Sequence, residues 1–158
     1  MQILCTLKGV PTFLCVYPSD LLTTTLYVSR FATLILNTDP HDAKGKHWLA
    51  IHLQRRSYSG SFFDSYGLPP VFPNILASLR RTCTVWEYNA TQLQGLTSTF
   101  CGKYCCLFAL NMDRVCTLKQ FVGLFDGAIA DRQFKLLFAS KFGPLRKHPR
   151  GGQWAHAS

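Results

Sequence analysis

Four residues of the sequence have the side-chain types of a cysteine nucleophile and its supporting groups: His47, Asp64, Gln94 and Cys101. The thiolate is the nucleophilic form of cysteine, and a histidine titrates in the range needed to hold the proton that the thiol releases. A carboxylate such as Asp64 can orient that histidine. The Gln94 amide and the backbone N–H of Cys101 are suitable donors for the oxyanion of a tetrahedral intermediate. These residue types indicate acyl-transfer chemistry, although types alone define no site.

Cys101 stands where a polar loop meets an apolar run. The loop from Gln94 contains glycine, and the run Cys105–Leu110 is typical of a buried helix, predicted to extend from Cys101 to about Met112. At the start of a helix, free N–H groups and the dipole favour an anion. Two other interpretations remain open: a small cysteine that packs the first turn, or a zinc site with its neighbouring cysteines, although the paired spacing of closed zinc sites is missing.

His47 and Asp64 flank a predicted β-hairpin. Its strands are Trp48–Leu53 and Ser61–Ser65, joined by a basic turn. If the turn centres on Arg55-Arg56, residues whose numbers sum to 111 face each other, which sets His47 opposite Asp64. Directly opposed residues have Cβ atoms about 4.5–5.5 Å apart. A bulge or a longer loop would change this register.

The rest of the chain predicts an α+β fold, with a central mixed, mainly antiparallel sheet and helices packed around it. β-branched and aromatic runs bounded by turn residues predict further strands, and capping residues before apolar stripes predict helices. The predicted strands are Phe13–Tyr17, Phe31–Leu36 and Thr82–Tyr88, and the predicted helices are Ile75–Arg81 after an Asn74 cap, one after Thr117 with Phe121, Leu124 and Phe125 inward, and one capped by Asp131 that ends near Phe142.

Length and composition favour one compact domain of reduced, intracellular type. The chain has 158 residues, of which 47% are hydrophobic, and seven cysteines at irregular spacing. We expect a domain over residues 1–144 and a basic, disordered tail over 145–158. The start of the sequence lacks the basic and apolar regions of a secretion signal, and no apolar run reaches the roughly 18 residues of a membrane span. The net charge of +9 is of the kind that attracts polyanions such as DNA, and a solvated basic tail that aids solubility accounts for it equally well.

The order and local context of the four residues resemble a known family. The pattern His47-Trp48, then Asp64 before Ser65-Tyr66-Gly67, then Gln94-Gly95, then Cys101-Gly102 seven residues after the glutamine resembles the adenain-like and ubiquitin-like-protein-specific cysteine peptidases. The chain is most similar to adenain-like proteins carried by large DNA transposons and related viruses. The resemblance implies a papain-like fold with the nucleophile at the N-terminus of a buried helix.

The resemblance also implies a role for each matching residue. Cys101 would attack the peptide carbonyl, His47 would hold and transfer the proton, Asp64 would orient His47, and Gln94 would help form the oxyanion hole. Trp48 would wall a narrow substrate channel that admits small residues, so cleavage at Gly-containing sites is expected. The implied function is a cysteine endopeptidase that matures viral or transposon-encoded precursor proteins. A protease that removes ubiquitin-like modifiers, and an inactive or truncated basic nucleic-acid-associated protein, remain as alternatives.

Partners and cofactors follow from the same resemblance. The expected substrates are polypeptides, the expected state is a monomer, and no metal or cofactor is required. DNA, or an activating peptide, is the expected regulator, in a nuclear or virion setting. In adenain a cysteine upstream of the glutamine can form a disulfide with the activating peptide, and Cys83 stands in the comparable place, where an ordinary strand cysteine fits equally well.

Overall fold

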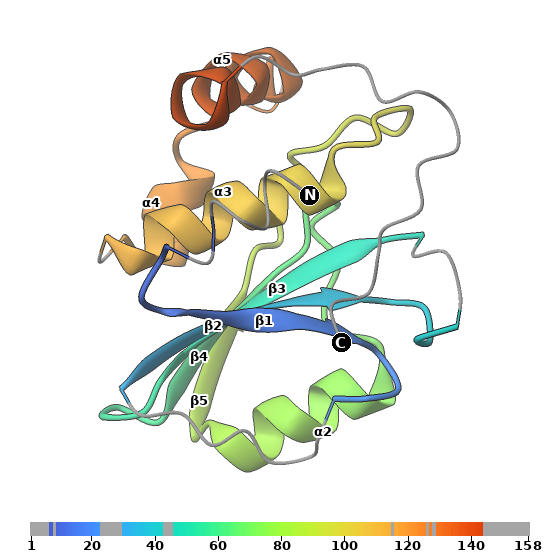
Figure 1. The fold of residues 1–158 in the computed structure, drawn as a ribbon, viewed down its shortest axis with the longest axis vertical. Helices are drawn as coiled ribbons and strands as arrows, with labels where there is room; N and C mark the ends of the chain where they lie inside the picture. Colours follow the sequence, from blue (N-terminus) through green and yellow to red (C-terminus); the bar gives the residue numbers. More distant parts are fainter. Residues whose placement is uncertain are drawn as a thin grey trace.

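The fold is a five-stranded mixed sheet with helices on both faces (Figure 1). The computed structural model describes residues 7, 9–22, 30–42, 46–114, 116–125, 127 and 129–143. The predicted tail, 145–158, lies outside the described residues. The strands are β1 (Phe13–Pro18), β2 (Phe31–Asn37), β3 (Trp48–Gln54), β4 (Ser59–Phe63) and β5 (Val85–Tyr88), and they lie in that order across the sheet.

Pairing in the sheet is antiparallel at its centre and parallel at both edges. β2 pairs with β3, and β3 with β4, in antiparallel orientation, whereas β1 pairs with β2 and β4 with β5 in parallel. The central hairpin therefore brings the start of β3 and the end of β4 to the same end of the sheet. His47 and Asp64 are the residues just beyond those two points.

The helices divide between the two faces of the sheet. In Figure 1, α2 covers one face and α3 covers the other, with α4 and α5 on the same side as α3. None of the helices in the described part of the chain has the length and apolar character to span a membrane. Their bounds are α2 (Pro73–Thr82), α3 (Cys101–Asp113), α4 (Leu118–Val122) and α5 (Ala130–Phe142).

Two hydrophobic cores result, because successive residues of a strand point to opposite faces. On the α3 side, Ala50 of β3 and Phe63 of β4 pack against α3. On the α2 side, Ile51 of β3 and Phe62 of β4 join the core that contains Ile75 of α2. Strands buried on both faces explain why β2 and β3 read as nearly continuous apolar runs.

Helix α3 is fixed in place by buried aromatic side chains. Phe108 stacks on Phe63 of β4, with ring centroids 5.0 Å apart. Tyr104, in the first turns of α3, stacks on Phe134 of α5 at 3.9 Å. Because α3 is held from both sides along its length, the position of its first residue, Cys101, is defined by the core. This confirms the predicted buried helix that begins at the cysteine.

Some predicted helix boundaries are wrong. Asn74 does not cap α2, because the helix already begins at Pro73, whose fixed φ suits the first helical position. Asp131 lies inside the first turn of α5 rather than at its cap. The capping box of Thr117 and Gln120 is confirmed at α4. Leu124, expected to point inward, follows the end of this short helix and is 44% exposed.

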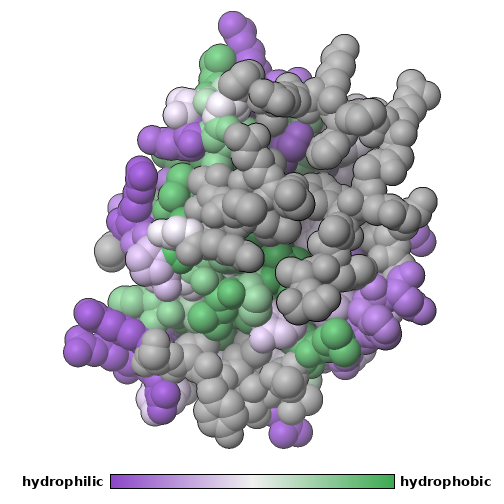
Figure 2. Space-filling model, in the orientation of Figure 1, coloured by the Kyte–Doolittle hydropathy of each residue, from purple (hydrophilic) through white to green (hydrophobic). Residues whose placement is uncertain are grey.

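On the face shown in Figure 2, hydrophilic side chains gather at the outline, and hydrophobic side chains are visible in the middle. Lys and Arg outnumber Asp and Glu by 17 to 8. Hydrophilic side chains are expected at the surface, because charged and polar groups remain hydrated there.

Candidate active site

His47 and Asp64 meet at the end of the central hairpin. Nε2 of His47 lies 2.8 Å from Oδ1 of Asp64, close enough for the imidazole to donate a hydrogen bond to the carboxylate. The side chain of Asp64 is only 5% exposed, and that of His47 is 19% exposed. A buried carboxylate held this way fixes the tautomer of the ring and leaves Nδ1 on the opposite side free for chemistry.

The two side chains meet although the predicted register is wrong. Phe62 pairs with Ile51, so partners sum to 113 rather than 111, and the turn centres one residue later than expected. A shift of two residues keeps every side chain on its predicted face, whereas a shift of one would have reversed the faces. Carried past the last pair, the observed register sets His47 against Tyr66, and their ring centroids are 5.0 Å apart.

A tight turn after β4 holds Asp64. The N–H of Gly67 donates to the carbonyl of Asp64, and the N–H of Tyr66 donates to its Oδ1. Asn89, which is buried after β5, completes the fixation: its Oδ1 accepts from the N–H of Asp64 at 2.9 Å, and its Nδ2 donates to the carbonyl of Asp64 at 2.6 Å. Hydrogen bonds therefore satisfy both the N–H and the carbonyl of Asp64. Because its backbone is fixed in this way, the carboxylate stays directed at His47.

Gly67 is required by this turn. Its φ is +73°, a region that L side chains avoid, and a Cβ added there would stand 2.7–2.9 Å from the backbone of Thr91 and Gln92. Gly143 has a similar φ of +84° but nothing within 4 Å of an added Cβ, which makes it a matched control.

We expect Gly67→Ala to destabilise the fold more than Gly143→Ala does. A backbone conformation with positive φ costs a residue with a side chain roughly 1–3 kcal/mol at either position. Only Gly67→Ala also forces backbone to move, which adds about 1–3 kcal/mol. Urea unfolding of the two variants and of Gly127→Ala, where an added Cβ meets nothing within 4 Å, measures the difference. Equal losses at positions 67 and 143 would contradict the steric account.

Cys101 is the first residue of α3 and is 8% exposed. Nδ1 of His47 is buried, and no described residue makes a hydrogen bond of good geometry with it. The Cys101 thiol is a neighbouring group with which the ring interacts. Burial lowers the pKa of His47, but interaction with the Asp64 carboxylate and the Cys101 thiol outweighs burial and raises this pKa to about 9. His47 is therefore an imidazolium at neutral pH, beside the first residue of α3.

Gln94 is brought to the same place but is enclosed by protein. It is 1% exposed, and its Oε1 accepts a hydrogen bond of 2.7 Å from Oγ of Ser65. Its Nε2 donates to the carbonyl of Ser98 at 2.6 Å and to Oη of Tyr66 at 3.3 Å. The structure thus places Gln94 beside the turn that holds Asp64, with its amide bonded to the surrounding chain.

Trp48 packs over the first turn of α3. A Cβ added to Gly102 would lie 3.3 Å from Cδ1 of the indole, so the glycine after Cys101 leaves room for this ring. Trp48 is partly buried against the α3 core. The ring is thus next to the candidate nucleophile, where a wall of the substrate channel was expected.

The loop between Gln94 and Cys101 is tied to α5. Oδ2 of Asp131 accepts from the N–H of Gly95 at 3.2 Å, and Oδ1 lies 3.2 Å from the hydroxyl of Tyr104. This contact explains why Asp131 does not cap its own helix. Its side chain instead joins α5, α3 and the loop that leads into the nucleophile.

The other described cysteines have the properties of structural thiols. Burial raises the pKa of each of them, to about 12 at Cys106. Among the described residues no three His, Cys, Asp or Glu side chains gather to hold a metal ion. The five are Cys15, Cys83, Cys105, Cys106 and Cys116.

Cys83, the candidate for a disulfide with an activating peptide, follows α2 and is 7% exposed. Its Sγ lies 2.7 Å from the position of a Cβ added to Gly60, near the start of β4. Asp64 follows the other end of that strand, so Cys83 is in the α2 core and away from the catalytic candidates.

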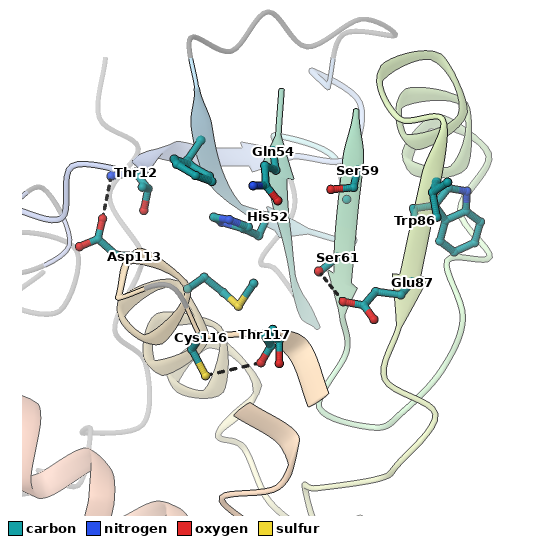
Figure 3. A pocket seen from close by; sticks show the side chains of 14 residues that line it. Thr12, His52, Gln54, Ser59, Ser61, Trp86, Glu87, Asp113, Cys116 and Thr117 are labelled. Atoms are coloured by element: carbon teal, nitrogen blue, oxygen red, sulfur yellow. Dashed lines mark hydrogen bonds between the residues drawn. The ribbon is translucent and has the colours of Figure 1, made fainter. Parts of the chain in front are cut away.

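A hollow lies at the opposite end of α3 from Cys101. It has a volume of about 290 Å³ and lies between the sheet and the residues around the start of α4 (Figure 3). His52 on β3 lines it, bonded through Nδ1 to Oγ1 of Thr33 at 2.8 Å. Burial lowers the pKa of His52 to about 4, so its imidazole is neutral, unlike that of His47. His52 is buried, with 7% of its surface exposed.

Three residues that hold the site were not singled out from the sequence: Ser65, Tyr66 and Asn89. Ser65 and Gln94 are 29 residues apart, and Asn89 and Asp64 are 25 apart. The adjacency of Ser65 and Tyr66 to Asp64 was the available signal, because a turn at a strand end presents successive side chains to one site. Asn89 carried no local signal, since a polar residue after a strand is ordinarily part of a turn.

Half of the chain is similar in sequence to known viral proteases. Over 93 residues, half of the chain, it is 28% identical to the protease of human adenovirus A serotype 12 and 31% identical to that of human adenovirus D serotype 17. These matches cover 45% and 44% of the viral proteins, so the chain spans less than half the length of these relatives. No protein-family model matches the chain.

Solved structures show the same fold. The crystal structure of the ASFV protease superposes with a TM-score of 0.54 and 22% identity, over 76% of this chain and 45% of that one. AvrA with IP6 and CoA gives a TM-score of 0.52 and 14% identity, over 89% of this chain and 62% of that one. The chain is thus similar to adenovirus proteases over half of its length, and it shares its fold with the ASFV protease and with AvrA.

Proposed function

We propose that this protein is a cysteine endopeptidase in which Cys101, His47 and Asp64 are the catalytic residues. The observation that carries the proposal is the position of His47, whose Nε2 is bound to Asp64 while Nδ1 is left to the thiol of Cys101. The adenovirus proteases that resemble half of the chain support the same reaction. Because the chain covers less than half of those proteins, the activity of the whole enzyme is part of the proposal.

The reaction would proceed in two stages. The Cys101 thiolate attacks the carbonyl carbon of the peptide bond, a C–S bond forms, and the carbonyl electron pair moves to oxygen. His47 imidazolium then gives its proton to the amide nitrogen, the C–N bond breaks, and the amine leaves a thioester on Cys101. In the second stage His47 takes a proton from water, the resulting hydroxide attacks the thioester, and the thiolate leaves.

Access to the nucleophile bears on the choice of substrate. Cys101 is 8% exposed and the indole of Trp48 packs on the adjacent Gly102. A passage bordered by an indole favours a substrate with small side chains next to the bond that is cut. We therefore retain cleavage at Gly-containing sites of viral or transposon-encoded precursors as the proposed specificity. Removal of ubiquitin-like modifiers is the alternative substrate class.

Selective alkylation tests the catalytic arrangement. At mildly acidic pH, iodoacetamide is expected to label Cys101 first, because ordinary thiols are protonated there, and mass spectrometry identifies the site. His47→Ala should slow this labelling, and Cys101→Ser should abolish the fast phase. If Cys101 reacts no faster than a free thiol, and its rate ignores His47, the catalytic interpretation fails.

Substrate class and activation require a cleavage assay. A Gly-containing structural polyprotein and a ubiquitin-like precursor would be incubated with the protein, each with and without duplex DNA. Preferential cutting of the polyprotein supports precursor maturation, and preferential cutting of the precursor supports the alternative. The net charge of +9 is the basis for including DNA, and stimulation that weakens with added salt would support it as an activator.

A further inference from the structure

A groove lies between helix α5 and the loop that leads into α3. It has a volume of about 600 Å³, and the reaction above gives it no role. We propose that this groove binds a segment of the polypeptide substrate in which an acidic residue stands beside a large aliphatic one, outside the residues next to the bond that is cut. The inference rests on the proposed function and adds a preference for substrate sequence to it.

Aliphatic side chains form one part of the groove. Leu93 of the loop and Ala130 of α5 are buried, whereas Ile129 and Leu136, which also line the groove, are 48% and 68% exposed. An aliphatic side chain of a bound peptide would cover the two exposed residues and remove apolar surface from water. A concave site with an apolar lining and a few charged groups is typical of a binding site.

The charged side chains of the groove are mainly basic. Its described lining carries Arg132 and Lys135 against one acidic residue, Asp131. Both carboxylate oxygens of Asp131 already accept hydrogen bonds, Oδ2 from the N–H of Gly95 and Oδ1 from the hydroxyl of Tyr104.

Arg132 is the side chain that is free to bind an acidic residue. It is exposed, and no carboxylate in the described part of the chain lies within ion-pair distance of its guanidinium. A guanidinium can bind a carboxylate through two parallel hydrogen bonds, so the geometry of Arg132 suits a glutamate or aspartate of the substrate.

The groove borders the loop that ends at the candidate nucleophile. Gly95, which lines the groove, follows Gln94 directly. Nζ of Lys135 lies 5.5 Å from the centre of the Phe100 ring, and Phe100 is the residue before Cys101. The groove and the nucleophile therefore share one loop, which places the groove where a polypeptide held at Cys101 can also contact it.

The combination of aliphatic and basic side chains favours a peptide over a nucleic acid. A nucleic acid is bound mainly through its phosphates, by clusters of Lys and Arg. It offers little aliphatic surface to Ile129 and Leu136, which are exposed in this groove. A peptide supplies a carboxylate and an aliphatic side chain in two neighbouring residues.

Peptide binding tests the groove without requiring catalysis. The probe is a dye-labelled peptide with two glutamate–leucine pairs among glycine and serine residues. Fluorescence anisotropy measures its Kd for the full chain with Cys101→Ser, which does not cut it. Partner peptides carry glutamine or lysine for glutamate, or alanine for leucine. We expect the glutamate–leucine peptide to bind roughly fivefold more tightly than the glutamine and alanine peptides.

Two further substitutions assign this preference to the groove. Arg132→Glu should reverse the charge preference in favour of the lysine peptide, because the repulsive partner is then the glutamate. Leu136→Ala should reduce the preference for leucine over alanine and leave the charge preference unchanged. Arg80→Glu makes the same charge change on α2, which covers the opposite face of the sheet, and should keep the wild-type preference.

The outcomes are distinct. Equal Kd values for the glutamate and glutamine peptides, or equal effects of Arg80→Glu and Arg132→Glu, would overturn the proposal, because attraction would then follow from net charge alone. Tighter binding of an oligonucleotide of equal charge, lost in Arg132→Glu, would overturn it in favour of a nucleic acid. Failure of the proposed function would show separately: the wild type would cut no peptide, while the Kd values in Cys101→Ser would still report on the groove.

Discussion

Replacing Cys101 with serine is expected to reduce peptide hydrolysis by roughly 10⁴-fold or more, with little change in stability. Residues of a nucleophile and base act as a unit, so loss of either member removes nearly the whole effect. His47→Ala should therefore cause a loss of the same order, and the double variant should be no worse than the single ones. Cleavage of a peptide that the wild type cuts, followed by product analysis, measures these losses.

A matched cysteine variant controls for general damage. Cys116 lies beyond the other end of α3, is partly buried, and donates its S–H to the carbonyl of Thr117. Cys116→Ser should keep at least half of the wild-type rate, because serine can make the same contact. Additive losses in the Cys101 and His47 double variant would contradict a shared mechanism, and a large loss in Cys116→Ser would point to the fold instead.

Asp64→Asn should lower activity at neutral pH by on the order of 10²-fold and move its alkaline limit to lower pH. The carboxylate is one of the groups that raise the pKa of His47 to about 9 against the effect of burial. Without its charge, the pKa falls towards the ordinary value of about 6.5. Because the imidazolium must protonate the leaving amine, wild-type activity is lost only above about pH 9, whereas the variant loses it nearer to neutrality.

The same shift predicts how stability depends on pH. The pKa of His47 in the folded protein is raised above its ordinary value, so proton binding stabilises the fold fully below about pH 6.5. That contribution is lost as the pH rises through about 9. Urea unfolding across this range should show the loss in the wild type and a smaller one in Asp64→Asn. Glu87→Gln, which removes an exposed carboxylate bonded to Ser61, should leave both profiles unchanged, and a similar change there would refute the assignment to Asp64.

Local patterns in the sequence were sufficient for most of the fold. β2 and β3 are dense in β-branched and aliphatic residues, and α3 is a long apolar run after a polar loop, so burial alone identifies them. The capping box of Thr117 is equally local, since both partners lie within three residues. These elements needed no knowledge of what they pack against.

The predictions that were wrong concern features whose structure is determined by a distant contact or by the backbone itself. Asn74 looked like a cap, but Pro73 starts the helix one residue earlier because its ring fixes φ. Asp131 looked like a cap too, but Gly95, 36 residues away, uses its carboxylate. The register of the hairpin depended on which residue the turn centres on, and the basic turn carried no glycine or asparagine pair that would have fixed it.

The candidate site divides in the same way. The residue types and their order, through the family that they resemble, predicted which side chains would meet. His47 and Asp64 flank the central hairpin, Cys101 begins α3, and Gln94 lies in the loop before that helix. The residues that hold these side chains in place could not be predicted from the sequence. Ser65 and Asn89 act through hydrogen bonds to residues that are 29 and 25 positions away in the chain. The direction of the Gln94 amide, which decides what it can donate to, is likewise a property of its surroundings and not of its spacing from Cys101.

The turn after β4 ties several backbone amides to one another. The N–H groups of Leu93 and Gln94 both donate to the carbonyl of Ser65 at 2.9 Å, and those of Tyr66 and Gly67 donate within the turn. None of these bonds can open alone without disturbing the others, so the segment behaves as one cooperative unit of local unfolding. One opening of this unit would disperse the Asp64 carboxylate, the Tyr66 ring against His47 and the Gln94 amide together, so the lifetime of the assembled site depends on how often the unit opens.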